Sequence, residues 1–100
     1  MPAYLIAQVQ IRDLAIYKQY TAQSPAIIAK HGGRILARGG ATEILEGDAH
    51  ERRVVIVEFP SMAAAKEFYE SPEYQAAKKI RTPISEASFV IIEGVDPRVR

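Results

Sequence analysis

An arginine and a glutamate, Arg38 and Glu58, are the side chains of this chain with the clearest capacity for chemistry. If the polar turn between their two apolar stretches centres near Asp48, residues whose numbers sum to about 96 lie opposite each other, which pairs Arg38 with Glu58. A carboxylate on a central strand needs a partner, because an isolated buried charge is costly. The pair predicts one of two things. It is a structural ion pair, or it is a pocket floor where Arg38 anchors an anion and Glu58 acts as a base or orienting carboxylate.

Three further residues on the expected helices carry polar groups that could meet a ligand. Tyr69, Tyr74 and His31 could act as hydrogen-bond donors from the helical side of the sheet. Aromatic residues at helical spacing are also typical of a core or an interface. His31 equally suits a helix C-terminus, where an imidazolium interacts favourably with the helix dipole. The rim formed by these three residues is therefore the second choice for a ligand site.

The first choice is the face of the sheet that the helices leave open. Tyr4, Gln8, Arg38 and Glu58 are the expected polar members of this otherwise apolar face. A largely apolar cavity with a few convergent polar groups is the usual make-up of a small-molecule site. We expect such a pocket between the open face and a second subunit, lined by these four residues.

Composition and charge argue against several classes of function. A net charge of +1 gives no electrostatic case for a nucleic-acid or membrane partner, and the absence of cysteine excludes disulfides and thiolate chemistry. Two isolated histidines, His31 and His50, lack a carboxylate at ligand spacing, so we expect no metal and no haem. No apolar run approaches the roughly 20 residues of a membrane span. We expect a cytoplasmic protein that works without a bound cofactor.

The elements that position these residues can be read from the apolar pattern. Three stretches, Tyr4–Gln10, Arg53–Phe59 and Ala87–Glu93, are apolar on both alternating faces, as in strands buried on both sides. The remaining sequence is long enough for only about two helices. These would form one layer, and one layer of helices covers one face of a sheet. The other face must meet something else, most simply a second copy of the chain. A homodimer is the firmest expectation.

The order of elements predicts an α+β fold of the ferredoxin-like β-α-β-β-α-β type, with a four-stranded antiparallel sheet and helices on one face. Strands one and three should be central. We expect one domain over residues 1–100, with residues 94–100 as a tail. The expected strands are Ala3–Gln10, Arg34–Leu45 with a bulge at Gly39-Gly40, Arg53–Phe59 and Ala87–Glu93. The expected helices begin after Asp13, Ser61 and Ser71, with a kink or fresh start at Pro25.

A family resemblance extends over almost the whole chain. It rests on five ordered motifs: His31–Arg34, Ala37–Gly40, Leu45–Gly47, Val57–Ser61 and Phe68–Tyr74. Together they resemble a family of small bacterial proteins of unknown function in the dimeric α/β-barrel, ferredoxin-like superfamily. The resemblance implies a homodimer whose two sheets face each other as a barrel. It transfers no catalytic residue, because the family has no established reaction and relatives on this fold differ in chemistry.

Two functions follow from these observations. The chain could bind or transform a small, partly apolar organic molecule without a bound cofactor. Alternatively it is a non-catalytic dimeric module in which the ion pair fixes the register between subunits. A ligand-sized void favours the first function, and a barrel filled by side chains favours the second.

Overall fold

The computed structural model of the chain describes residues 1–96 and 98. Residues 97, 99 and 100 of the expected tail therefore lie outside the described residues. The elements run in the order β1 (Ala3–Ile11), α1 (Leu14–Thr21), α2 (Ser24–Lys30), β2 (Arg34–Arg38), β3 (Arg53–Phe59), α3 (Met62–Glu70), α4 (Pro72–Arg81), the 3-10 helix η1 (Thr82–Ile84) and β4 (Ser85–Glu93).

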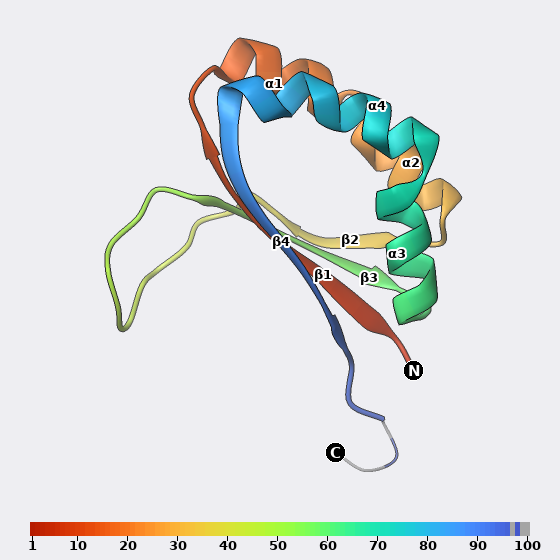
Figure 1. Cartoon of the computed structure of the whole chain (residues 1–100). Helices are drawn as coiled ribbons and strands as arrows, with labels where there is room; N and C mark the ends of the chain where they lie inside the picture. Colours follow the sequence, from red (N-terminus) through yellow and green to blue (C-terminus); the bar gives the residue numbers. More distant parts are fainter. Residues whose placement is uncertain (97, 99–100) are drawn as a thin grey trace.

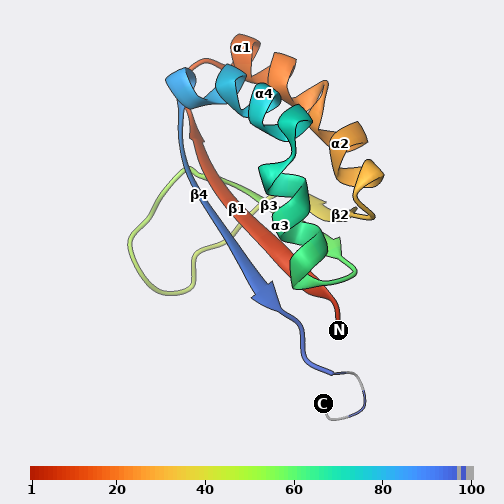
Figure 2. The ribbon, with the colours of Figure 1, turned by 45° about the vertical axis from the view of Figure 1, so that its right-hand side comes forward.

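The four strands form one antiparallel sheet in the order β2-β3-β1-β4. All helices lie on the same side of this sheet (Figures 1 and 2). The expected α+β, ferredoxin-like architecture is therefore confirmed, including the central position of the first and third strands. The fourth strand begins at Ser85, two residues before the expected Ala87.

Side-chain caps start three of the helices where the sequence predicts them. In each case a side-chain oxygen accepts a hydrogen bond from the backbone N–H three residues further on, which satisfies one of the free donors of the first turn. The bonds run to Asp13 from Ile16 at 3.1 Å, to Ser61 from Ala64 at 3.1 Å and to Ser71 from Tyr74 at 3.2 Å. At Pro25 the chain makes a fresh helical start rather than a kink, because α1 ends at Thr21 and α2 begins at Ser24.

The hydrophobic core lies between the sheet and the helices. Its strand residues come from the helix-facing positions of β1 and β3, and its largest helical members are aromatic. The fully buried set includes Ala3, Leu5, Ala7, Val9, Val57, Phe59, Phe68 and Tyr74. The alternate residues of β1 and β3 face the opposite side of the sheet, which the helices leave open.

Strand β2 is shorter than expected. It ends at Arg38 instead of Leu45, because Gly39 takes a left-handed conformation with a φ of 67° that turns the chain away from the sheet. A side chain at Gly39 would also lie only 2.5 Å from the Arg53 guanidinium. Residues 39–52 then form a long loop that projects from the sheet (Figure 1).

A bulge in β2 overturns the expected pairing of Arg38 with Glu58. The register shifts between Ile35 and Ala37, so the bulge lies before the glycine pair rather than at it. Arg34 is the residue opposite Glu58, and Arg38 lies opposite Val55 on the helix-facing side. Because successive residues of a strand alternate between faces, the extra residue places the two arginines on opposite faces.

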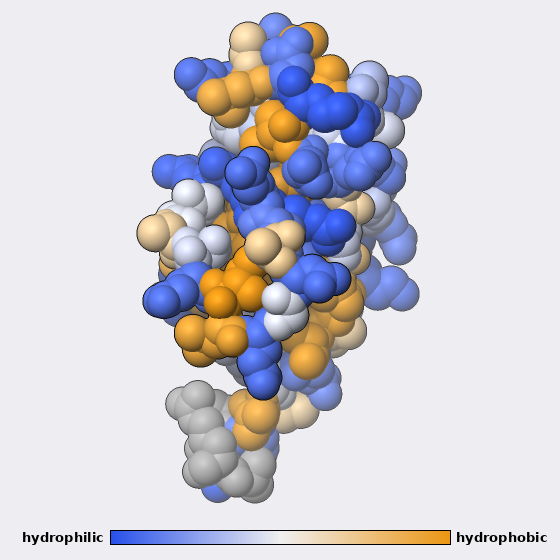
Figure 3. All heavy atoms as spheres, turned by 90° about the vertical axis from the view of Figure 1, so that its left-hand side faces the viewer, coloured by the Kyte–Doolittle hydropathy of each residue, from blue (hydrophilic) through white to orange (hydrophobic). Residues whose placement is uncertain are grey.

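The open face of the sheet carries apolar side chains that the described residues leave at least partly exposed. Ile6 pairs with Ile56 on one side and with Val90 on the other, at the centre of this face. Val90 and Ile92 are 53% and 55% exposed. Figure 3, which views the molecule from the side where the loop projects, shows apolar groups between hydrophilic ones. No helix in the described part of the chain has the length and apolar character needed to cross a membrane.

Candidate functional site

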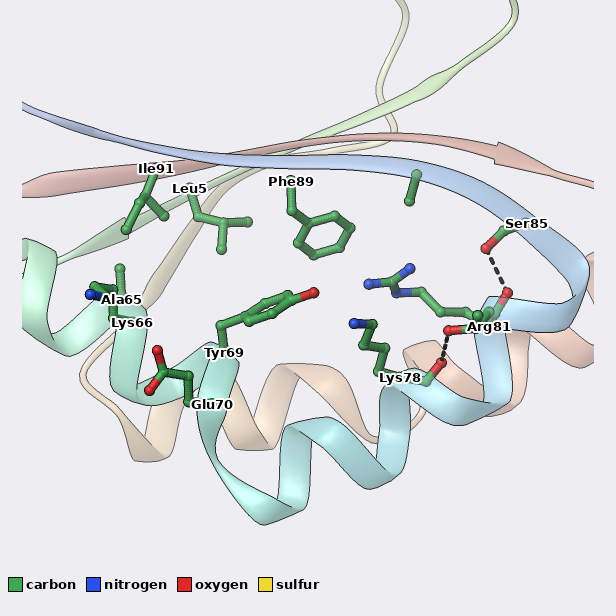
Figure 4. Close-up of a pocket in the computed structure, with 12 residues that line it drawn as sticks. Leu5, Ala65, Lys66, Tyr69, Glu70, Lys78, Arg81, Ser85, Phe89 and Ile91 are labelled. Atoms are coloured by element: carbon green, nitrogen blue, oxygen red, sulfur yellow. Dashed lines mark hydrogen bonds between the residues drawn. The ribbon is translucent and has the colours of Figure 1, made fainter.

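A large cavity lies on the helix side of the sheet. It has a volume of about 530 Å³ and lies between the β1–β4 side of the sheet and helices α3 and α4 (Figure 4). This volume is within the range of roughly 300–1,000 Å³ that is usual for small-molecule sites. Its lining comprises Leu5, Ala65, Lys66, Tyr69, Glu70, Lys78, Arg81, Thr82, Ser85, Ala87, Phe89 and Ile91.

The two ends of the cavity differ in chemistry. Leu5 and Ile91 from the sheet give one end an apolar wall, which Lys66 and Glu70 from α3 flank, and Lys78 and Arg81 from α4 form a cationic end (Figure 4). In Figure 4 the Tyr69 hydroxyl points from α3 toward the cationic end, beneath Phe89 and the sheet. The cavity can therefore hold an apolar body at one end and a polar or charged group at the other.

Helix α4 brings the polar groups of the site onto one stripe. Tyr74, Lys78 and Arg81 are separated by four and three residues, so they lie on one face of the helix. The end of the helix is fixed by two hydroxyls that donate to its last carbonyls, Thr82 to Lys78 at 2.8 Å and Ser85 to Arg81 at 2.6 Å. These bonds hold the last turn, and with it the two cations, against the start of β4.

The Arg81 guanidinium is almost fully removed from water, because the residue is only 5% exposed. Its Nη2 and Nε atoms donate to the Tyr74 hydroxyl at 3.2 and 3.4 Å. Its Cζ atom lies 4.3 Å from the centre of the Phe89 ring, in a cation–π contact. The Tyr74 hydroxyl also lies 2.8 Å from the Tyr20 hydroxyl, so the cation lies at the end of a chain of phenols.

Burial sets the protonation of this chain of phenols. Desolvation raises the pKa of Tyr74, opposed by the nearby Arg81 cation. Desolvation raises the pKa of Tyr20 as well, with a further contribution from Tyr74. For Arg81, desolvation lowers the pKa, but the contributions of Tyr74 and Tyr20 outweigh it and the net direction is upward. At neutral pH the site therefore holds a cation beside neutral phenols.

Alkaline pH should destabilise the folded protein through these buried tyrosines. Desolvation raises the pKa of Tyr17, Tyr20 and Tyr74 above the usual value of 10.0. The unfolded chain then loses these protons first, so stability is fully present below pH 10.0 and falls as the pH rises above it. Urea unfolding at pH values on both sides of 10.0 measures this. Stability that does not change across this range would contradict the buried, neutral phenols.

The residues of the expected helical rim do not all meet at the cavity. Tyr69 lines it, and Tyr74 lies behind it, fully buried, with its ring centre 5.4 Å from that of Tyr69. His31 is the C-terminal cap of α2 and packs edge-on against Phe68, with ring centres 6.1 Å apart. Its Nε2 atom is buried without a hydrogen-bond partner among the described residues, and His31 is not part of the cavity lining.

Three of the four expected pocket residues, Tyr4, Gln8 and Glu58, pair with arginines other than Arg38 or with each other. Glu58 accepts hydrogen bonds from Tyr4 at 3.3 Å and from Arg34 at 2.9 Å. Gln8 accepts from Arg52 at 3.4 Å. We call Tyr4, Arg34 and Glu58 the open-face cluster. The Glu58 side chain is 28% exposed, so this cluster is only partly buried in the single chain.

Arg38, the fourth expected residue, lies in different surroundings on the helix-facing side. It borders a small void of about 40 Å³ together with Arg53 and Tyr17. The Arg53 guanidinium lies 5.7 Å from the centre of the Tyr17 ring. Arg38 therefore contributes neither to the open-face cluster nor to the lining of the large cavity.

Sequence reasoning missed the cationic end of the cavity. Lys78 and Arg81 were not among the expected site residues, although their spacing from Tyr74 marks a helical stripe with a tyrosine at its start. Basic residues in the last turn of a helix are common and usually solvated, so this signal is weak. Within residues 1–96 and 98, no three His, Asp or Glu side chains are grouped as a metal ion would require.

Solved structures with the same fold come from several bacteria. A protein of unknown function from Rhodopseudomonas palustris, RPA0582, is 23% identical, with 96% of this chain and 84% of that chain covered and a TM-score of 0.77. SnoaB, a cofactor-independent oxygenase from Streptomyces nogalater, is 13% identical, with coverage of 99% and 98% and a TM-score of 0.68. A dimeric ferredoxin-like protein of unknown function from Bacteroides fragilis is 20% identical, with coverage of 93% and 96% and a TM-score of 0.63. At these identities the likeness shows the fold.

Sequence similarity places the chain in a family. No curated protein shows significant similarity to it. The family model described as a domain of unknown function, DUF1330, matches residues 2–95, which is nearly the whole chain. The resemblance inferred from the sequence motifs is thereby confirmed, and this chain belongs to the DUF1330 family.

Proposed function

We propose that this chain binds or transforms a small, partly apolar organic molecule in the cavity between the β1–β4 side of the sheet and helices α3 and α4, without a bound cofactor. The observation that carries the proposal is the cavity itself, with its volume of about 530 Å³, its apolar wall and its convergent polar groups. The cofactor-independent oxygenase SnoaB supports the proposal through its shared fold alone.

The proposed site replaces the one first expected on the open face. There the Glu58 carboxylate already accepts hydrogen bonds from Arg34 and Tyr4, which fix its orientation. In the cavity, by contrast, the Tyr69 hydroxyl and the Lys78 ammonium line open space (Figure 4). We assign Tyr69 the role of a hydrogen-bond donor to the bound molecule.

The second candidate function is a non-catalytic dimeric module, and the open-face cluster favours it. Glu58, with Arg34 and Tyr4, lies beside the apolar field that a second copy would cover. A polar cluster within an apolar interface can fix the register of two subunits. The dimeric neighbour from Bacteroides fragilis supports a homodimer. Both functions use the homodimer, and only the first uses the cavity.

Blocking the cavity should abolish binding of small molecules. Ala87 lines the cavity from β4 and is exposed, so Ala87→Trp fills the space without replacing a core residue. Thermal-shift screening with a set of small aromatic and alicyclic compounds should give hits for the wild type that Ala87→Trp loses.

The matched control is Ala76→Trp, on an exposed position of α4 that does not line the cavity. It should keep the wild-type hits. Hits that survive in Ala87→Trp, or a wild type that binds none of the compounds, would overturn the proposed site and leave the dimeric module as the better function.

A further inference from the structure

We infer that the molecule bound in the cavity is an organic carboxylate. Its anionic head binds between Arg81 and Lys78, and its apolar body extends toward Leu5 and Ile91. This inference rests on the proposed function, because it names the class of ligand for the same cavity. It starts from the Arg81 cation, which lacks an anionic partner in the described part of the chain.

Arg81 is a buried charge that the protein solvates only in part. A guanidinium that has left water needs an anion or several good acceptors to offset the loss of hydration. The two bonds from Nε and Nη2 both go to one neutral acceptor, the Tyr74 hydroxyl, although a guanidinium has five N–H donors. Phe89 contributes its ring face, which accepts no conventional hydrogen bond. The Arg81 guanidinium therefore has further N–H donors for a molecule bound in the cavity.

The only carboxylate in the cavity lining does not supply the missing charge. Glu70 is exposed and takes part in none of the ion pairs formed by the described residues. In Figure 4 its carboxylate lies on the far side of Tyr69 from Arg81. The described residues therefore supply no negative charge beside Arg81, and we assign that role to the bound molecule.

Lys78 adds a second cation at the same end. Its ammonium lies 5.0 Å from the centre of the Tyr69 ring, and Lys78 likewise forms no ion pair with a described residue. Figure 4 shows the Lys78 ammonium and the Arg81 guanidinium close to the Tyr69 hydroxyl. Three donor groups from two helices thus converge at one end of the cavity, and the sheet gives the opposite end an apolar wall of Leu5 and Ile91.

A carboxylate fits this arrangement better than a phosphate. The cations lie in and near the last turn of α4, where the helix dipole is negative and disfavours a dianion. Phosphate sites usually use backbone N–H groups at the start of a helix, and this end of α4 presents carbonyls instead. A planar, singly charged group can take the edge of one guanidinium and leave the rest of the molecule to apolar walls.

Matched pairs of ligands test the inference directly. The probes are 2-naphthoate and cyclohexanecarboxylate, each compared with its neutral amide, and binding is measured by calorimetry. The wild type should bind each carboxylate at least about tenfold more tightly than its amide, since charge-assisted hydrogen bonds are roughly twice as strong as neutral ones. In Arg81→Met this preference should fall to about twofold or less. Lys79→Gln, an exposed position outside the lining, should keep it.

Two further measurements keep the outcomes distinct. If Arg81→Met does not fold, Lys78→Gln should weaken binding of the carboxylates and leave the amides unchanged. Inorganic phosphate should not compete with 2-naphthoate. Equal binding of acids and amides, with both lost in Ala87→Trp, would overturn the carboxylate inference and leave the proposed site intact. Binding of either class that survives in Ala87→Trp would overturn the site itself.

Discussion

Replacing Tyr74 with alanine should lower the free energy of unfolding by about 3–5 kcal/mol, the usual cost of removing a large aromatic side chain from a core. Tyr74 is fully buried, and its ring centre lies 4.5 Å from that of Phe68 and 5.4 Å from that of Tyr69. Its hydroxyl also receives the two hydrogen bonds of Arg81. The variant loses packing and leaves a buried cation without its acceptor. Urea unfolding followed by circular dichroism measures the effect.

Two variants separate packing from polarity. Tyr74→Phe keeps the ring and removes the acceptor, so it should cost about 1–3 kcal/mol, as expected when buried donors lose their partner. Tyr69→Ala removes an aromatic ring from the cavity wall, where Tyr69 is only half-buried, and should cost less than Tyr74→Ala. A Tyr74→Ala variant no less stable than Tyr69→Ala would contradict the complete burial of Tyr74 and its bonds with Arg81.

Local sequence patterns predicted the fold because almost every element has one. The two apolar faces of β1 and β3, the serine caps and the proline starts each limit the chain to one local structure, and together they leave one topology. The register of β2 needs more. A bulge of one residue near Leu36 places Arg34 instead of Arg38 opposite Glu58. No residue type at this position predicts the bulge.

The candidate site was harder to predict, because the burial of its charged group depends on tertiary packing. Tyr69 could be identified from its place on α3, but Arg81 is an ordinary basic residue of a last helical turn until β4 brings Phe89 over it. The burial of this guanidinium depends on how β4 and α1 pack against α4, because Phe89 and Tyr20 lie against it. Helical spacing could mark Tyr74, Lys78 and Arg81 as one stripe, but it could not show that a cavity lies in front of it.

A substitution on the open face should have the second large effect, which is loss of the homodimer. The wild type should have a mass of about twice the 11.1 kDa chain in light scattering after gel filtration. Ile56→Asp should make it a monomer at micromolar concentration. Ile56 pairs with Ile6 at the centre of the open face, where a second sheet would remove an aspartate from water. An unpaired charge at such a position costs about 3 kcal/mol or more, which weakens dimerisation by at least about 100-fold.

The control for assembly is Ala63→Asp, on the exposed side of α3, which should remain a dimer. Because Ile56 lies outside the core on the helix side, Ile56→Asp should keep the wild-type circular dichroism spectrum. The cavity is also on the helix side, so a folded Ile56→Asp monomer that still binds small molecules would show that each subunit carries a complete site. A wild type that is monomeric at micromolar concentration would contradict the homodimer, and the apolar side chains of the open face would then need another partner.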